Sequence, residues 1–267
     1  MRVLFFGDVV GKTGRRGLAA ILPKLRKKHK PHLVIANGEN AAHGSGLTVK
    51  TASALFNAGV DFITSGNHIF KKRDQAEEVF AKFPGRVIRP GNFEGQLIGK
   101  GWGKVPVGKT EVFIANFNSQ VFMENQFEGL ISSPFKALDK FLQNVPKSSI
   151  IIIDFHSEAT SEKRAFGFYA DGRVSAVIGT HTHVPTADAQ ILPRGTAYLS
   201  DVGMVGAADT VLGVDKQKAV NGFLTGRFVG EGMVESSEAE VGYAIIEIAG
   251  ASGQAKSIRS FVERVKI

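Results

Sequence analysis

Polar side chains capable of binding metal ions stand at or just after the ends of several short apolar runs in this chain. They are Asp8, Glu39, Asn40, Asn67, His68, His156, His181 and His183. Carboxylate, amide and imidazole groups are ligands for hard and borderline ions. A lone histidine is usually structural, but the same placement after five apolar runs is hard to explain by packing. The pattern predicts one metal site.

The segment GTHTH holds the strongest pair, His181 and His183. Side chains two positions apart on an extended segment point to the same side, so the two imidazoles could reach two ions held side by side. A surface His-x-His pair is the alternative, although the apolar run VSAVIG leads directly into it. A lone buried imidazole is the alternative for His156, and a solvated turn residue for Asp8 and Glu39.

The composition limits the chemistry and the location. The chain has 267 residues and no cysteine, so thiolate sites are excluded and a metal must bind nitrogen or oxygen. No apolar stretch approaches the length of a membrane span, and the first residues lack the pattern of a signal peptide. We therefore expect a cytoplasmic protein with no membrane partner.

The net charge of +8 is concentrated near the start of the sequence. The basic residues there follow Asp8 without an opposing acid and are Lys12, Arg15, Arg16, Lys24, Arg26, Lys27, Lys28 and Lys30. Such a face attracts phosphorylated ligands and could bind RNA, but a solvated helix surface is the plainer interpretation.

The first ninety residues alternate apolar runs with amphipathic segments, as in parallel βαβ units. We expect strands at VLFFG, LVIAN, DFITSG and RVIRP, helices over 14–30, 47–58 and 72–80, and ligands at the carboxyl ends of the strands. Further strand-like runs follow, with helices over 132–143 and 157–169. Residues 91–108 are expected to be irregular. Residues 1–267 are interpreted as one domain, in which 201–232 lacks clear strands and could cap the site.

The ordered set GD, GEN, GNH, FH and GTHTH resembles the calcineurin-like metallophosphoesterases, and more closely their bacterial YmdB-like branch. The similarity covers nearly the whole chain, including MRVLFFGDVVG, NGENAA, SGNH and GTHTHVPTAD. It implies an α/β fold in which two mixed central sheets, flanked by helices, form a four-layer αββα sandwich.

The resemblance also implies a role for each site residue. Asp8, Glu39, Asn40 and His183 would hold one metal ion, while Glu39, Asn67, His156 and His181 would hold a second, with Glu39 bridging. His68 would be the catalytic imidazole. Two departures from the broad superfamily match the YmdB-like branch: Val10 replaces the usual histidine of GDxH, and Glu39 replaces the bridging aspartate. Asn40 would supply the missing ligand.

Members of the branch look like 2′,3′-cyclic nucleotide phosphodiesterases. The implied reaction is hydrolysis of substrates such as 2′,3′-cyclic AMP to nucleoside monophosphates, by attack of a hydroxide that bridges the two metals. The implied cofactors are two divalent or trivalent ions, iron foremost, with manganese or zinc as alternatives. A metal-dependent phosphatase or RNase, or a regulatory cyclic-nucleotide sensor, remains the alternative function.

A homo-oligomer is a further expectation, because Phe122, Phe127 and Phe135 lie in a polar context and could form an interface. Ordinary core packing is the alternative for the same residues.

Overall fold

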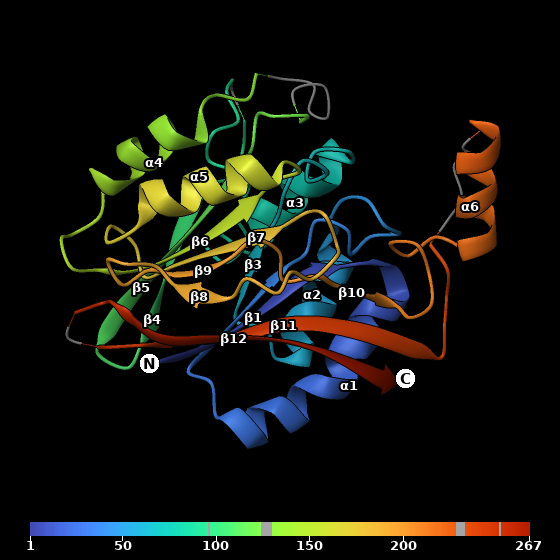
Figure 1. Ribbon diagram of the computed structural model, residues 1–267, viewed down its shortest axis with the longest axis horizontal. Helices are drawn as coiled ribbons and strands as arrows, with labels where there is room; N and C mark the ends of the chain where they lie inside the picture. The colour runs from blue at the N-terminus through green and yellow to red at the C-terminus, as the bar shows by residue number, and fades with distance from the viewer. Residues whose placement is uncertain (96, 124–129, 228–232, 251) are drawn as a thin grey trace.

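Two six-stranded sheets pack face to face between outer helices, as the computed structural model shows (Figure 1). It describes residues 1–95, 97–123, 130–227, 233–250 and 252–267. This arrangement, together with its mixed strand directions, confirms the α/β fold class expected from the sequence.

The first sheet has the order β12-β11-β10-β1-β2-β3. Its strands are β1 (Arg2–Val9), β2 (Leu33–Asn37), β3 (Phe62–Thr64), β10 (Met204–Ala207), β11 (Glu238–Ile248) and β12 (Ala255–Lys266). β1 runs parallel to β2 and β10, and β2 parallel to β3, whereas β11 is antiparallel to its neighbours. The three parallel strands β1, β2 and β3 therefore end at the same edge.

The second sheet has the order β4-β5-β6-β7-β9-β8. Its strands are β4 (Trp102–Val107), β5 (Thr110–Asn118), β6 (Ile150–His156), β7 (Ala176–Thr180), β8 (Gln190–Ile191) and β9 (Ala197–Leu199). β5, β6, β7 and β9 are parallel, and β4 and β8 are antiparallel edge strands.

Six helices occur in the described part of the chain. They are α1 (Gly11–His29), α2 (Val49–Ala58), α3 (Arg73–Lys82), α4 (Pro134–Leu142), α5 (Thr160–Ala170) and α6 (Lys216–Thr225). Their local sequences explain where some begin: Thr48 forms a capping box with Thr51 before α2, and Ser133 caps α4 just before Pro134. None of the helices in the described residues is long and apolar enough to cross a membrane.

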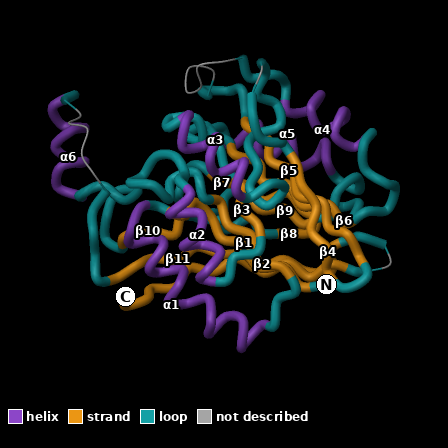
Figure 2. The backbone as a smooth tube through the Cα atoms, turned by 180° about the vertical axis from the view of Figure 1, so that it is seen from behind, coloured by secondary structure: helices purple, strands orange, loops and turns teal. Residues whose placement is uncertain are grey.

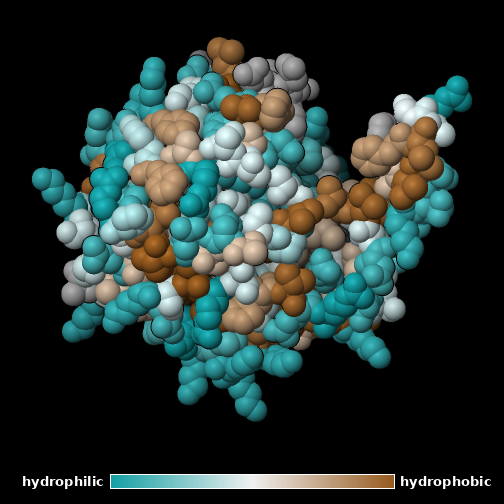
Figure 3. Space-filling view, in the orientation of Figure 1, coloured by the Kyte–Doolittle hydropathy of each residue, from teal (hydrophilic) through white to brown (hydrophobic). Residues whose placement is uncertain are grey.

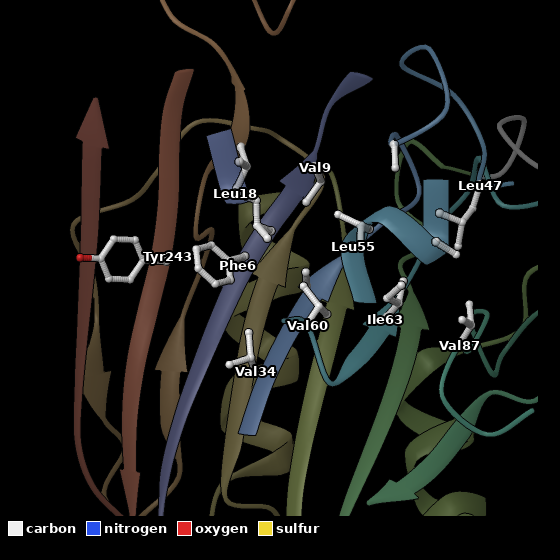
Figure 4. Close-up of a cluster of buried hydrophobic side chains, with 14 of the residues drawn as sticks. Phe6, Val9, Leu18, Val34, Leu47, Leu55, Val60, Ile63, Val87 and Tyr243 are labelled. Carbon is white, nitrogen blue, oxygen red and sulfur yellow. The ribbon is translucent and has the colours of Figure 1, made fainter. Parts of the chain in front are cut away.

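In the described residues, three buried apolar clusters fill the spaces between the four layers. Strand β1 contributes to two of these clusters, because successive side chains on a strand point to opposite faces of the sheet. Val3 and Phe5 belong to the core between the sheets, whereas Leu4 and Phe6 belong to the cluster under the helices (Figure 4). Full burial of a side chain of this size stabilises the fold by about 1.5–3 kcal/mol.

Three local expectations were wrong. RVIRP forms only an isolated bridge between Val87 and Ile63, since Pro90 has no N–H with which to continue the pairing. The Gly-rich range 91–108 contains β4, an edge strand that tolerates Pro106 because one side needs no partner. The range 201–232, expected to lack strands, contains β10 in addition to α6; its residues 228–232 lie outside the described ones. A single domain over 1–267 stays a prediction.

α6 projects away from the two sheets (Figures 1 and 2). Within it Gly222 is the buried residue, while Val220, Phe223 and Leu224 are exposed. Apolar colour along this projection is visible in the space-filling view (Figure 3).

Candidate metal centre

The carboxyl ends of five parallel strands bring the sequence-predicted side chains together from both sheets. β1, β2 and β3 lead to Asp8, Glu39 and Asn67, and β6 and β7 lead to His156 and His181. All of them except His181 are buried, as is Asn40. Consequently the oxygen-bearing candidates come from one sheet and the imidazoles at the centre of the cluster from the other.

Glu39, His156 and His181 form the densest part of the cluster. One potential ligand atom from each lies within 4.8 Å of those of the other two. Nε2 of His156 is 3.1 Å from Oε1 of Glu39 and 3.1 Å from Nδ1 of His181. Oδ1 of Asn67 lies 2.9 Å from the same Nε2. The other three residues predicted to hold this ion therefore all approach Nε2 of His156.

Asn40 lies at the centre of the other predicted set. Its Nδ2 is 3.1 Å from Oε1 of Glu39, 3.2 Å from Nε2 of His183 and 3.5 Å from Oδ1 of Asp8. Its amide oxygen faces Nδ1 of His68 at 2.7 Å. Ligation through oxygen, as predicted for Asn40, requires the opposite orientation of this amide.

Gly66 leaves the space in which the ligand atoms meet. A Cβ at this position would clash with Oε2 of Glu39 and Nε2 of His156. Moreover, the buried Nδ1 of His183 has no hydrogen-bond partner among the described residues. With two carboxylates, two amides and three imidazoles, the donor set suits borderline ions such as Fe, Mn or Zn. The residues thus fit the implied metals.

His68 stands at the rim of the cluster. Its backbone N–H donates to Oε2 of Glu39 at 3.0 Å, and its Nδ1 is 3.4 Å from Oε1 of the same carboxylate. The side chain is about a third exposed, at 29%. Its position combines contact with the metal-binding candidates and access from solvent.

A hydrogen-bonded chain behind His156 fixes the orientation of its ring. Nδ1 of His156 is 2.9 Å from Oγ1 of Thr180, which donates to Oδ1 of Asp154 at 2.7 Å. The buried Asp154 also accepts hydrogen bonds from Asn37 and Thr64, at the ends of β2 and β3. One carboxylate therefore ties together four strand ends beneath the cluster.

The segment that carries His181 and His183 is not extended, contrary to expectation. Both residues have positive φ, 96° and 64°. Between them Thr182 donates from its backbone N–H and its hydroxyl to Oδ2 of Asp201, at 3.1 and 2.7 Å. Asp201 in turn accepts from the buried Lys163 at 2.7 Å. This turn anchors Thr182 to Asp201, and the imidazoles on either side of it reach the cluster.

Burial and neighbouring charges move the pKa values of the cluster in opposite directions. Burial raises the pKa of Glu39, but His156 outweighs it and lowers the value to about 2. Burial lowers the pKa of His156, but Glu39 raises it to about 9. For His181, burial and the charge on His156 lower the pKa to about 3. The carboxylates thus favour positive charge at this point, and a cation would supply it.

A cavity of about 280 Å³ opens onto the cluster. It is lined by Glu39, Asn40, Gly44, His68, Glu158, His181, Thr182, His183, Leu212 and Met233. Oε2 of Glu158 lies 2.9 Å from Nε2 of His181. Sequence reasoning missed Glu158 and Asp154. The alternation of a strand could have identified Asp154, since it shares a face of β6 with His156.

The remaining histidines lie outside this cavity. His43 is exposed, and His32 accepts a hydrogen bond from the backbone of Arg2. His29, in the last turn of α1, is also away from the cluster.

Acids from distant parts of the chain partly neutralise the basic face of α1. Lys12 pairs with Glu235 at 2.8 Å and Arg26 with Asp61 at 3.0 Å. The sequence gives no local sign of either pair. The face is thus less positive than its own segment indicates.

The three phenylalanines differ in environment. Phe122 is 77% exposed, whereas Phe135 packs against Phe166 and Tyr169. Phe127 lies outside the described residues.

Comparison with known proteins places this arrangement in context. The profile of the YmdB-like protein family matches residues 4–261. A 2′,3′-cyclic-nucleotide 2′-phosphodiesterase of Bacillus subtilis is 46% identical over 226 residues, which are 84% of this chain and 83% of the relative.

Solved structures agree with the sequence comparison. A phosphatase of Mycoplasma pneumoniae is 30% identical, with a TM-score of 0.90 over 100% of this chain and 94% of its own. The calcineurin-like phosphoesterase YfkN of B. subtilis shares the fold at 14% identity, with a TM-score of 0.61 over 98% of this chain and 90% of its own.

Proposed function

The chain belongs to the YmdB-like protein family, and on that premise we propose that it hydrolyses 2′,3′-cyclic nucleotides to nucleoside monophosphates with the help of two metal ions. Its general class is a hydrolase of phosphoric ester bonds. The Bacillus subtilis relative is named as a 2′,3′-cyclic-nucleotide 2′-phosphodiesterase, and it is similar to this chain over most of both sequences.

One observation carries the proposal: the meeting of buried carboxylates, amides and imidazoles at the floor of an open cavity. We assign Asp8, Glu39, Asn40 and His183 to one ion and Glu39, Asn67, His156 and His181 to the other. Iron is the first candidate, with manganese and zinc next. Bound there, such ions would supply Lewis acidity and an activated water for attack on phosphorus.

The side chains of the protein perform the remaining tasks. His68 lines the cavity, and its Nδ1 faces the side-chain amide of Asn40, which leaves Nε2 for contact with substrate. In the proposed reaction the bond from phosphorus to one ribose oxygen breaks, and His68 gives a proton to that oxygen. General acid catalysis by a positioned side chain contributes roughly 10²–10⁴-fold to rate.

The proposal is tested by elemental analysis of the purified protein together with a substrate screen. We expect two metal equivalents per chain and turnover of 2′,3′-cyclic AMP faster than that of 3′,5′-cyclic AMP or 5′-AMP. Hydrolysis of the monoester alone would instead indicate a phosphatase. Tight binding of cyclic nucleotides without turnover, with each of iron, manganese and zinc, would indicate a sensor.

A further inference from the structure

We propose that Leu212 and Met233 form an apolar wall on which the nucleobase of the substrate packs, so that they determine preference for nucleotides over smaller cyclic phosphates. This inference rests on the proposed function and adds the recognition of the base. It begins with the uneven lining of the cavity. Among the described residues that line it, most of the side chains are polar or ionisable, whereas Leu212 and Met233 are large and apolar.

Two glycines on other loops leave the space that the side chain of Met233 occupies. A Cβ at Gly44 would lie 2.5 Å from Cγ and Cε of Met233, and a Cβ at Gly213 would lie 2.7 Å from its sulfur. Both glycines have positive φ, 82° and 94°. The thioether is therefore seated between two loops.

The backbone after Met233 is anchored to two separate elements. Val234 donates its N–H to the carbonyl of Gly213 at 2.8 Å, and Ser236 donates its N–H to the hydroxyl of Thr13 at 3.1 Å. Thr13 belongs to α1, which follows the strand that carries Asp8. These contacts keep the wall at a fixed position relative to the metal-binding candidates.

Leu212 lies in a tight turn of the loop that contains Gly213. Val211 and Val214 exchange backbone hydrogen bonds of 2.9 Å around it, and Gly213 donates to the hydroxyl of Thr210 at 3.0 Å. Its φ of 53° is uncommon for a residue with a bulky side chain, and such conformations persist only where surrounding contacts impose them. Leu212 is 41% exposed and lines the cavity.

The chemistry of the wall suits the face of a base. Purines and pyrimidines present planar, weakly hydrated faces, and sulfur makes favourable contacts with aromatic rings. Because the wall itself offers no side-chain hydrogen bond to a base edge, it accepts each base. We therefore infer weak discrimination among the four bases and strong discrimination between nucleotides and base-free analogues.

The test compares 2′,3′-cyclic AMP with the 2′,3′-cyclic phosphate of methyl riboside, which keeps the reacting group and the sugar. Met233→Ala and Leu212→Ala should each lower kcat/KM for the nucleotide by roughly tenfold, mainly through KM. For the base-free substrate the change should stay within about twofold. Met233→Leu should largely restore nucleotide turnover. Val262→Ala, an exposed apolar residue of β12, is the matched control.

The outcomes separate the two proposals. If the wild-type protein hydrolyses both substrates and the variants lose the same factor on each, the wall is refuted while the reaction stands. Equal kcat/KM for both substrates in the wild-type protein also refutes the apolar wall and leaves the proposed reaction standing. If the wild-type protein with its metals hydrolyses neither substrate, the proposed function fails and the wall fails with it.

Discussion

Oγ1 of Thr180 lies 2.9 Å from Nδ1 of His156 and donates a hydrogen bond to Oδ1 of Asp154. The hydroxyl must then accept the hydrogen on Nδ1, which leaves Nε2 facing Glu39 and Asn67. Partners of this kind orient metal-binding histidines, and their loss typically costs 10–100-fold in metal affinity or activity.

Asp154→Asn should therefore lower metal affinity by roughly 10–100-fold while the fold is kept. Competition with a chromophoric chelator would measure the affinity. Thr180→Ser, which retains the hydroxyl, should stay near wild type, whereas Thr180→Val should resemble Asp154→Asn. Wild-type affinity in both Asp154→Asn and Thr180→Val would rule out this positioning role.

His68→Ala should keep its metals and lose about 10²–10⁴-fold in turnover, because the proton for the leaving oxygen is missing. Asp8→Ala and Glu39→Ala should lose metal as well as turnover. Parallel elemental analysis and kinetics separate the cases. His43→Ala is the control, since this histidine is exposed and outside the cavity. Turnover of His68→Ala at the wild-type rate would disprove the assigned role.

Gly66→Ala should abolish metal binding, because its methyl group would clash with Oε2 of Glu39 and Nε2 of His156. Isothermal titration with Mn²⁺ measures this loss, and circular dichroism checks the fold. Gly250→Ala adds the same methyl group at a position where, in the described part of the chain, no atom beyond its chain neighbours lies within 4 Å. Undiminished binding in Gly66→Ala would contradict the inferred position of the ions.

Lys163→Met should lower the free energy of unfolding by about 3–5 kcal/mol, since it leaves the buried carboxylate of Asp201 without its ion-pair partner. The double variant Lys163→Met with Asp201→Asn should be less destabilised than the single one. Urea unfolding of the two variants and the wild type provides the measurement. Equal stability of wild type and Lys163→Met would show that the pair is dispensable.

Asp188 should contribute a pH-dependent part of stability away from the metal centre. Burial raises the pKa of Asp188, but hydrogen bonds from Ser200 and Thr186 outweigh it and lower the pKa below its ordinary value. A carboxyl group with a lower pKa in the folded state stabilises the fold above its unfolded pKa of about 3.9. That contribution disappears as the pH falls through the folded value.

Asp188→Asn should accordingly show a smaller loss of unfolding free energy between pH 6 and pH 3 than the wild type. Urea unfolding across this range measures it. The exposed Glu94→Gln is a control for removal of a charge. If the unfolding free energy of Asp188→Asn fell with pH as steeply as that of the wild type, the hydrogen bonds to Asp188 would contribute nothing to this pH dependence.

Site residues that directly follow an apolar run are predictable from the sequence. Asp8 and His156 are expected at strand ends because an apolar run stops at each; β6 ends at His156, and β1 ends one residue after Asp8, at Val9. The family resemblance added the order of the ligand set and the αββα sandwich. Local patterns therefore indicate where the cluster forms.

Contacts made by distant segments were not predictable in the same way. The turn at Thr182 depends on Asp201, and its effect on the two neighbouring imidazoles requires positive φ values that no local pattern indicates. Met233 reaches the cavity only because Gly44 and Gly213, far away in the sequence, leave space for it. Such features arise from tertiary packing.

The division of the ligand candidates between the sheets bears on the mechanics of the fold. One sheet supplies the oxygens of Asp8, Glu39 and Asn67, and the other supplies the nitrogens of His156 and His181. A cation shared between them would cross-link the two layers, and by mass action its binding free energy would add to their cohesion. Chelation should therefore speed amide hydrogen exchange in both sheets at once, beginning at the edge where β3 and β7 end.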